Sequence, residues 1–394
     1  MTEIGTKLKP VPKRPAVAIV TSYWGDARTE AVGASRVLAG ALALHADVTV
    51  IHLADDEPAT YADSVFEVRR VSVRGAEPTR AMLLRQALAA RNGSGDVPAA
   101  GLALLSEYDG EAPGVLEVLE ATDPVSVVLV GSYQPWDLVA LGRGHRRVVT
   151  VPFCSERPLF ASELAALIEA ADVVGAIHPG EFAEIAAAAP ERASDVVALD
   201  IAFGSNAHAR AEELAGIGKI GPYSLLVRSF PEGGPRAEAT VGCEVLRYAL
   251  DGFPVAEVDG NTWWLTAKKG IGPLRVGKNR VNFARLVAHA KVMVDVRPQG
   301  PVGRLAIEAM LYGVPIVVPD DSAAKAHAEA ANGGLWYRDE GELFDETRAI
   351  IKTPLGDRLA EQARAYAEKR HGDIDAFTAR VAALVLGIRS PVDS

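Results

Sequence analysis

The residues best suited to chemistry lie in one strand–loop–helix segment, Val292 to Pro319. A buried apolar strand, VMVDV, is followed by a loop with Gly300 and Gly303 and then by a helix that begins near Arg304 and carries Glu308. Unpaired backbone N–H groups at a helix N-terminus favour an anion, and the helix dipole adds to this preference. Glu308 lies about one turn into the helix, where its carboxylate can accept both hydroxyls of a ribose. The segment therefore predicts an anion site beside a ribose site.

A second group of candidates follows predicted strands in the first half of the chain. These candidates are Trp24, Asp26, Glu156 and His178. Ligands of open α/β sheets bind beyond the carboxyl ends of the strands, so these side chains are expected at one cleft. A purely structural role for His178 and a solvent-exposed role for Arg304 stay open at this stage.

Alternating strand and helix signals must position these residues. Strands are expected where apolar, β-branched runs are bounded by loops, over 16–21, 47–53, 65–73, 125–131, 147–151, 173–177, 223–228, 254–258, 274–276, 292–296 and 315–319. Helices are expected over 36–44, 78–91, 161–171, 236–250, 281–290, 305–311, 357–368 and 373–386, and Gly33 is expected in the loop before the first of them.

This alternation predicts an α/β protein built from two doubly wound, Rossmann-like domains. The Gly-containing stretch 205–221 is the expected linker. We expect a disordered leader over 1–15, an N-terminal domain over 16–210 and a C-terminal domain over 211–394. In two-lobed folds of this kind the last helix can cross back onto the first domain.

Composition narrows the classes of function. The 394 residues include 41 Lys and Arg against 51 Asp and Glu, a formal net charge of -10, which argues against a nucleic-acid partner. No apolar run is long enough to span a membrane and no signal peptide is recognisable, so any membrane contact is expected to be peripheral. Two cysteines, Cys154 and Cys243, give no disulfide framework, which fits a reducing cytoplasm. The sequence contains no cluster of Cys and His or of Asp residues with metal-ligand spacing, so no bound metal is expected.

The sequence also lacks the common nucleotide-binding fingerprints. It contains no Walker A motif, and no G-x-G-x-x-G follows the first strand. Instead, the Val292 to Pro319 segment resembles the C-terminal domain of GT-B glycosyltransferases, above all the retaining group called family 4, with the motif E-G-F-G-L-P-x-x-E-A-M-A-x-G-x-P-V-V. The matching positions are Gly303, Glu308, Ala309, Met310, Gly313, Pro315, Val317 and Val318. Near the N-terminus, VGASR at 32–36 stands where the family often has G-G-A-E-R, and the order of elements agrees over nearly the whole chain.

The resemblance implies a hexosyltransferase-type enzyme whose co-substrate is a nucleoside diphosphate sugar, with no other cofactor and no metal. The donor would lie on the C-terminal side, held by the loop from Gly300 through Gly303 to Arg304, by Arg228 at the end of YSLLVR, and by Glu308. The glycosyl acceptor would lie on the N-terminal side, near Trp24, Asp26, Gly33, Glu156 and His178. The resemblance does not identify the catalytic residues.

Three departures from the family pattern keep other functions open. The first Glu of the motif is replaced by Gly300, the donor-binding Lys by Gly233, and VPFCSERP lacks the His that often follows the corresponding strand. Loss of one preorganised donor to a leaving group typically costs on the order of 10²–10³ in rate. The alternatives are a catalytically silent homologue, acting as a partner subunit or a sugar-nucleotide sensor, and a GT-B-fold nucleotide-sugar epimerase.

Overall fold

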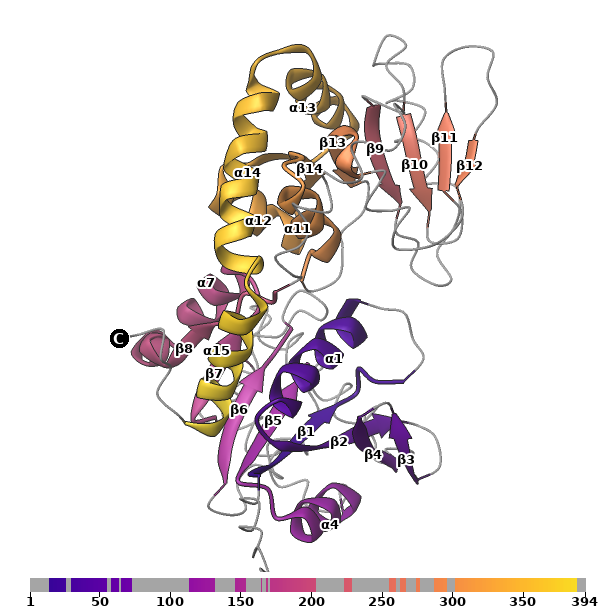
Figure 1. Cartoon of the computed structure of the whole chain (residues 1–394). Coiled ribbons are helices and arrows are strands. Elements are labelled where there is room, and N and C mark those ends of the chain that lie inside the picture. Colours follow the sequence, from indigo (N-terminus) through magenta and orange to yellow (C-terminus); the bar gives the residue numbers. More distant parts are fainter. Residues whose placement is uncertain are drawn as a thin grey trace, which may run out of the picture.

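The computed structural model describes residues 14–25, 30–54, 58–63, 65–72, 113–131, 146–153, 164, 168, 171–202, 223–228, 255–259, 263–266, 274–276, 287–295 and 302–387. These residues form two α/β lobes, one above the other in Figure 1. The expected leader and the expected linker fall almost wholly outside the described residues, so the predicted domain boundaries stay predictions.

The N-terminal lobe is built on an eight-stranded sheet with the order β3-β4-β2-β1-β5-β6-β7-β8. All neighbouring strands pair in parallel except the edge strand β3, which is antiparallel to β4. The strands are β1 (Ala16–Thr21), β2 (Asp47–Ala54), β3 (Ala59–Asp63), β4 (Phe66–Ser72), β5 (Ser126–Val130), β6 (Arg147–Val151), β7 (Val173–Ala176) and β8 (Val196–Ala198). The helices are α1 (Glu30–Ala43), α4 (Pro113–Thr122), α7 (Pro179–Ala188) and the short 3-10 helix η1 (Pro190–Asp195).

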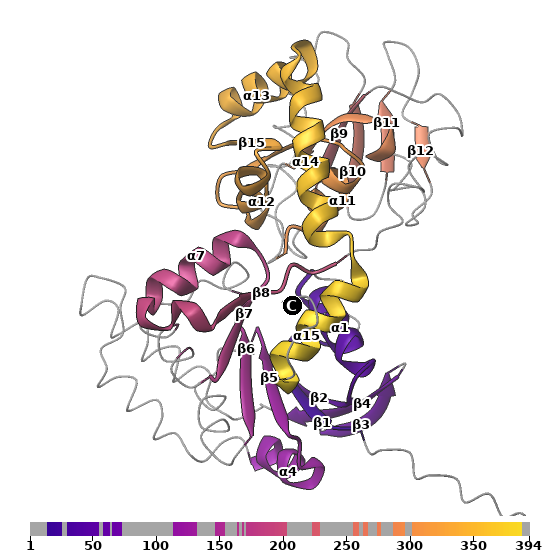
Figure 2. The same cartoon turned by 60° about the vertical axis from the view of Figure 1, so that its left-hand side comes forward.

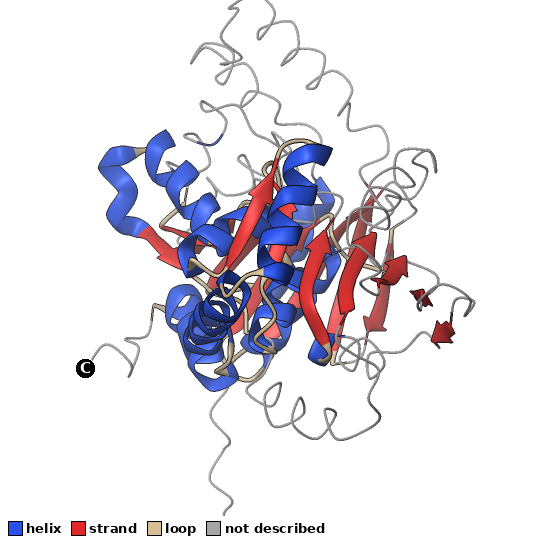
Figure 3. Cartoon of the chain, turned by 90° about the horizontal axis from the view of Figure 1, so that it is seen from above, coloured by secondary structure: helices blue, strands red, loops and turns tan. Residues whose placement is uncertain are grey.

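The C-terminal lobe is built on a seven-stranded sheet with the order β12-β11-β10-β9-β13-β14-β15. The neighbouring strands β10, β9, β13, β14 and β15 pair in parallel, and β11 and β12 are antiparallel additions at one edge. The strands are β9 (Tyr223–Arg228), β10 (Val255–Asp259), β11 (Trp263–Thr266), β12 (Leu274–Val276), β13 (Ala290–Asp295), β14 (Ile316–Pro319) and β15 (Gly334–Tyr337). The helices are α11 (Arg304–Leu311), α12 (Ala323–Ala331), α13 (Glu340–Lys352) and α14 (Leu355–His371). In Figure 1 these helices lie to the left of β9–β12, and Figure 3 shows the helices and strands of the whole chain from above.

Alternating side chains of the strands bury both faces of each sheet. In β1, Val17 and Ile19 pack with α1, whereas Ala18 and Val20 pack on the opposite face, where α4 and α7 contribute. The same alternation places Val292 and Val294 of β13 in a cluster with residues of α13 and α14. Burial of both faces explains why these strands are continuous apolar runs in the sequence.

The last helix, α15 (Ile374–Leu386), lies on the N-terminal lobe although α14 belongs to the C-terminal one. Figures 1 and 2 show α14 leading down into α15, which packs beside α1. Ser126 Oγ donates to the carbonyl of Val385 at 2.7 Å, and Arg147 Nε donates to the carbonyl of Leu384 at 3.0 Å. The chain therefore passes between the lobes twice.

The predicted start of the first helix is wrong, and the residues concerned, Glu30 and Gly33, lie at the candidate site. The helix expected over 36–44 begins at Glu30, and Gly33 lies inside α1 rather than in a loop. Ala31, Ala34 and Leu38 form one buried face of this helix, and their packing outweighs the cost of about 1 kcal/mol for a glycine inside a helix.

Candidate functional site

The strand–loop–helix segment predicted as the anion site has the expected local structure at its C-terminal side. α11 begins at Arg304, and Gly303 is its N-cap residue with φ 66°, in the left-handed region. A Cβ at this position would lie 3.1 Å from the backbone N and Cα atoms of Ala324 on α12. Glycine is thus favoured both by the backbone conformation and by the close approach of α12. Gly300 lies outside the described residues.

A carboxylate from the other lobe already occupies this turn. Glu30 Oε2 accepts hydrogen bonds from the backbone N–H of Val302 at 3.0 Å and of Gly303 at 3.1 Å, and Glu30 Oε1 accepts one from the N–H of Arg304. Burial raises the pKa of the Glu30 carboxyl, while the three N–H donors and the Arg304 guanidinium act in the opposite direction. The turn at the start of α11 therefore binds an anion within the structure itself.

Two predicted donor-site residues lie directly beside this turn. Arg304 Nε donates to Glu308 Oε1 at 2.9 Å, one helical turn further along α11, and both side chains are only partly exposed. Gly33 of α1 faces the same group, because a Cβ there would lie 3.8 Å from Arg304 Nη1. The structure therefore brings Gly33, Gly303, Arg304 and Glu308 together where α1 and α11 meet.

His178 lies at a second contact between the lobes and has a clear local role. It is the N-cap of α7: its Nδ1 accepts from the N–H of Glu181 at 3.0 Å, and the Glu181 carboxylate accepts from the N–H of Ile177 at 2.7 Å. This differs from a capping box, in which the carboxylate binds the N–H of the N-cap residue itself, because Glu181 binds the N–H of the residue before the N-cap. The ring is 6% exposed, and burial lowers its pKa to about 4. Because Nδ1 accepts, the neutral ring carries its proton on Nε2, which lies buried.

The ring of His178 faces His327 on α12, with the centroids 6.1 Å apart, and His327 faces His371 at 5.2 Å. His327 Nε2 donates to the carbonyl of Val302 at 3.0 Å, so its Nδ1 accepts from the hydroxyl of Tyr366 at 2.9 Å. Burial lowers the pKa of His327 and His371 and raises that of Tyr366. We call His178, His327 and His371 the histidine contact; all three rings are neutral at physiological pH.

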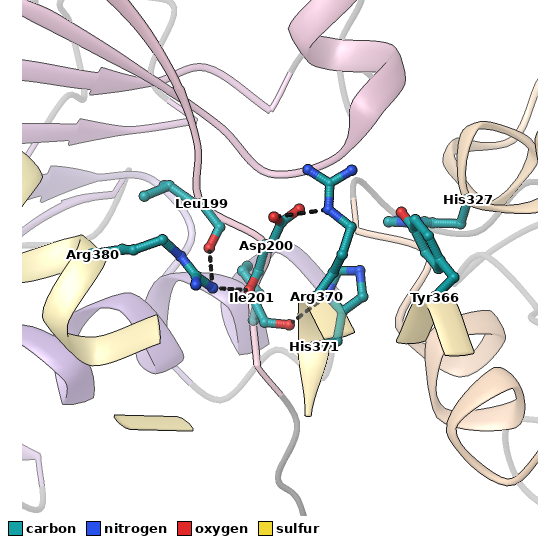
Figure 4. A network of polar contacts seen from close by, with 8 residues as sticks. All are labelled: Leu199, Asp200, Ile201, His327, Tyr366, Arg370, His371 and Arg380. Atoms are coloured by element: carbon teal, nitrogen blue, oxygen red, sulfur yellow. Dashed lines mark hydrogen bonds and ion pairs between the residues drawn. The ribbon is translucent and has the colours of Figure 1, made fainter. Parts of the chain in front are cut away.

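The two passages of the chain between the lobes are tied together beside the histidine contact (Figure 4). Arg370 Nε donates to Asp200 Oδ2 at 2.9 Å, and His371 Nδ1 donates to the carbonyl of Ile201 at 2.9 Å. Asp200 has φ 46°, and Arg380 reaches the carbonyls of Leu199 and Asp200, each at 3.4 Å. The segment that leaves β8 is therefore held by the end of α14 and by Arg380 in the middle of α15.

Comparison with solved structures fits this arrangement, whereas the sequence matches no family model and no curated protein. Sucrose-phosphate synthase from Thermosynechococcus elongatus is 15% identical, with a TM-score of 0.59 over 94% of this chain and 98% of that one. The Anabaena protein HepE in complex with UDP-glucose is 14% identical, with a TM-score of 0.57 over 95% and 100%. An α,α-trehalose-phosphate synthase (UDP-forming) from Burkholderia vietnamiensis is 12% identical, with a TM-score of 0.58 over 95% and 100%.

The chain has the GT-B fold. The two doubly wound domains expected from the sequence are confirmed as a fold class, and the similarity extends over nearly the full length of these structures. At this level of identity the likeness concerns the fold, so the donor and acceptor residues stay predictions.

The remaining candidates are only partly placed by this GT-B structure. Arg228 is the last residue of β9, paired with Asp259 of β10, and its backbone alone is described. Trp24 is 3% exposed; its Nε1 donates to Asp63 Oδ2 at 3.0 Å and its ring packs edge-on against Phe66. The indole thus belongs to the core of the N-terminal lobe. Asp26 and Glu156 lie outside the described residues.

Sequence reasoning missed two residues of the site, Glu30 and His327. Glu30 is an acidic residue in the first turn of a helix, a common position, and its partner lies 272 residues further along the chain. His327 lies on a helix that we did not predict. The role of His178 did carry a signal, since His178 and Glu181 have the spacing of a capping box.

The described residues offer neither a metal site nor a membrane-spanning helix. No group of three or more His, Cys, Asp or Glu side chains is arranged to hold a metal ion there. No helix in that part of the chain is both long and apolar enough to cross a bilayer.

Proposed function

We propose that this protein is a GT-B glycosyltransferase that transfers a sugar from a nucleoside diphosphate sugar to an acceptor bound on the N-terminal lobe. The observation that carries the proposal is the turn at the start of α11, where three backbone N–H groups converge on a carboxylate between the lobes. A phosphate group has the same charge sign and similar acceptor oxygens, so the turn suits the diphosphate of such a donor. We propose a retaining reaction, as the sequence resemblance implies. We also propose a cytoplasmic location, from the two cysteines, and no bound metal, from the lack of an acidic cluster in the sequence.

Each residue then has a chemical task. Negative charge develops on the departing diphosphate, and the N–H groups of Val302, Gly303 and Arg304 would stabilise it without reorganising. Glu308 would accept the ribose hydroxyls once released from its ion pair with Arg304, and the freed guanidinium would face the phosphates. Closure of the two lobes would exclude water from the reacting groups.

The first donor to test is a UDP-sugar, because HepE is described in complex with UDP-glucose and the trehalose-phosphate synthase as UDP-forming. We expect calorimetry to show that at least one member of a panel of UDP-, GDP- and dTDP-sugars binds the protein. When an acceptor is present, the reaction with that sugar nucleotide should release nucleoside diphosphate. Arg304→Ala, Glu308→Ala and Arg228→Ala are each expected to weaken donor binding by about tenfold, the equivalent of about 1.4 kcal/mol. Glu329→Ala, at an exposed position on α12, is the control and should leave binding unchanged.

A catalytically silent homologue is the second candidate. It is favoured by the occupied turn and by the absence of the family's first Glu and Lys, at Gly300 and Gly233. Such a protein would bind a nucleotide sugar in calorimetry and never release nucleoside diphosphate with any acceptor. Analysis of the recovered nucleotide sugar for a changed stereocentre tests the epimerase alternative in the same samples.

A further inference from the structure

The Glu30 carboxylate joins two helices from different lobes. Glu30 is the first residue of α1, and Arg304 is the first residue of α11. The positive ends of two helix dipoles therefore meet at this one carboxylate. Within the described residues, the carboxylate accepts three hydrogen bonds, all from backbone N–H groups of the opposite lobe.

The same three N–H groups are those a donor phosphate would need. A backbone N–H directed at a carboxylate oxygen does not donate to a second anion, and two anions in one turn would repel each other. The ion pair between Arg304 and Glu308 adds to this, since both predicted donor contacts are already engaged with each other. The three N–H groups of the turn and the side chains of Arg304 and Glu308 therefore all have hydrogen-bond partners without a ligand.

We propose that Glu30 is a built-in competitor for the phosphate site, so that a nucleotide sugar binds only after Glu30 leaves the α11 turn. This inference rests on the proposed function, because it takes the turn as the donor site. Glu30 lies on the N-terminal lobe, so its departure requires α1 and α11 to separate. Donor binding and the opening of the lobes at this edge are therefore coupled.

The histidine contact meets the same turn from the other side. Val302 donates its N–H to Glu30 and accepts from His327 Nε2 with its carbonyl. The turn is therefore held in its N–H-presenting conformation by α12 and does not depend on Glu30 for its shape. Removing the Glu30 carboxylate is expected to leave an open anion site.

The test compares nucleotide affinity in variants of the full chain. UDP, GDP and dTDP are titrated by calorimetry into the wild type, Glu30→Ala, Glu30→Gln and the control Glu120→Ala, an exposed residue of α4 far from the contact. The apparent affinity of a site falls with the fraction of molecules in which it is free, so Glu30→Ala should bind at least one diphosphate about tenfold more tightly or better. Glu30→Gln keeps the shape and loses the charge, and it should show a smaller gain in the same direction. Solution scattering should show a larger radius of gyration for Glu30→Ala than for wild type without ligand.

Each other outcome overturns the inference in a distinguishable way. Equal binding by the wild type and both variants would show that Glu30 does not compete, while the donor site would stand. Weaker binding by Glu30→Ala would make Glu30 a part of the donor site. If no protein of the set binds any diphosphate, the proposed function fails together with the inference. If Glu30→Ala does not fold, the isosteric Glu30→Gln decides alone, and an unchanged affinity counts against the inference.

Discussion

The two contacts between the lobes differ in chemistry: one is made by an ionisable carboxylate and the other by neutral aromatic rings. At the Glu30 contact, a partly buried ionisable carboxylate is bound by backbone N–H groups. At the histidine contact, three neutral rings pack in the interior, and His327 and His371 are fully buried. In our proposal, a donor phosphate would accept hydrogen bonds from the same three N–H groups that now bind the carboxylate of the first contact. No small ligand can replace the second, whose rings are packed against each other. The Glu30 contact is therefore suited to exchange with a ligand, whereas the histidine contact is suited to stay formed.

The largest effect is expected from acid, which should lower the free energy of unfolding by acting on the histidine contact. The pKa of His178 is about 4 in the folded protein, against about 6.5 in an unfolded chain. Between these pH values the unfolded chain binds a proton that the folded protein does not. The free energy of unfolding therefore falls as pH drops from 6.5 to 4, on the order of 3 kcal/mol for His178 alone. His327 and His371 act in the same direction.

Urea unfolding at pH 7.5 and pH 4 measures this loss. Other ionisable groups also contribute over this pH range, so a variant must isolate the contribution of His178. His178→Ser keeps a side-chain oxygen as the N-cap of α7 and removes the imidazole. The pH-dependent loss should shrink in this variant by about the share expected for His178. An identical loss in both proteins would show that His178 is not held neutral.

A smaller effect is expected at the ion pair that ties the two passages together. Asp200→Ala removes the partner of Arg370 in a partly buried place, and hydrogen bonds to charged groups typically contribute about 1.5–3 kcal/mol. Arg364→Ala is the control, because Arg364 pairs with Glu368 on the exposed side of the same helix, and such pairs contribute under about 1 kcal/mol. Both free energies of unfolding come from urea denaturation at pH 7.5. Equal losses in the two variants would contradict a special role for the Asp200 pair.

The smallest effect is expected at a single glycine of the Glu30 contact. Gly303→Ala places a Cβ on a residue with φ 66° and 3.1 Å from the backbone of Ala324, which should lower stability by about 1–2 kcal/mol. Gly40→Ala, in the middle of α1 with nothing within 4 Å of the new Cβ, should instead raise stability by about 0.5–1 kcal/mol. Thermal unfolding of the two variants gives shifts of opposite sign. A stabilising Gly303→Ala would mean that the turn at α11 relaxes freely.

Sequence patterns predicted the central parallel strands of both sheets, because buried parallel strands are rich in apolar, β-branched residues. They missed the edge strands β3, β8 and β15 and the antiparallel strand β11. The expected strand at 16–21 matches β1, and the one at 147–151 matches β6. The start of α1 was wrong because Gly33 suggests a loop, while the burial of Ala31 and Ala34 in three dimensions decides for a helix. Local signals describe a strand better than they describe where a helix begins.

Only the part of the site made by residues close in sequence could be predicted. The turn before α11 could be expected from Gly303, Arg304 and Glu308, which are close in sequence. The carboxylate that fills it could not, since no local pattern links Glu30 to a turn 272 residues away. His178 follows the same rule: its capping role is visible three residues on, at Glu181, whereas its contact with His327 depends on how the lobes meet.

The paired passages of the chain between the lobes set the kind of movement that the molecule can make. A single connecting segment would let one lobe swivel freely against the other. Here the segment through Asp200 and Ile201 lies beside the junction of α14 and α15, and the two are joined by Arg370 and His371. We expect two attachments joined at one edge to favour rotation of the lobes about that edge. If Glu30 leaves the α11 turn as we propose, such a rotation would carry it away from α11 and return it to the same three N–H groups.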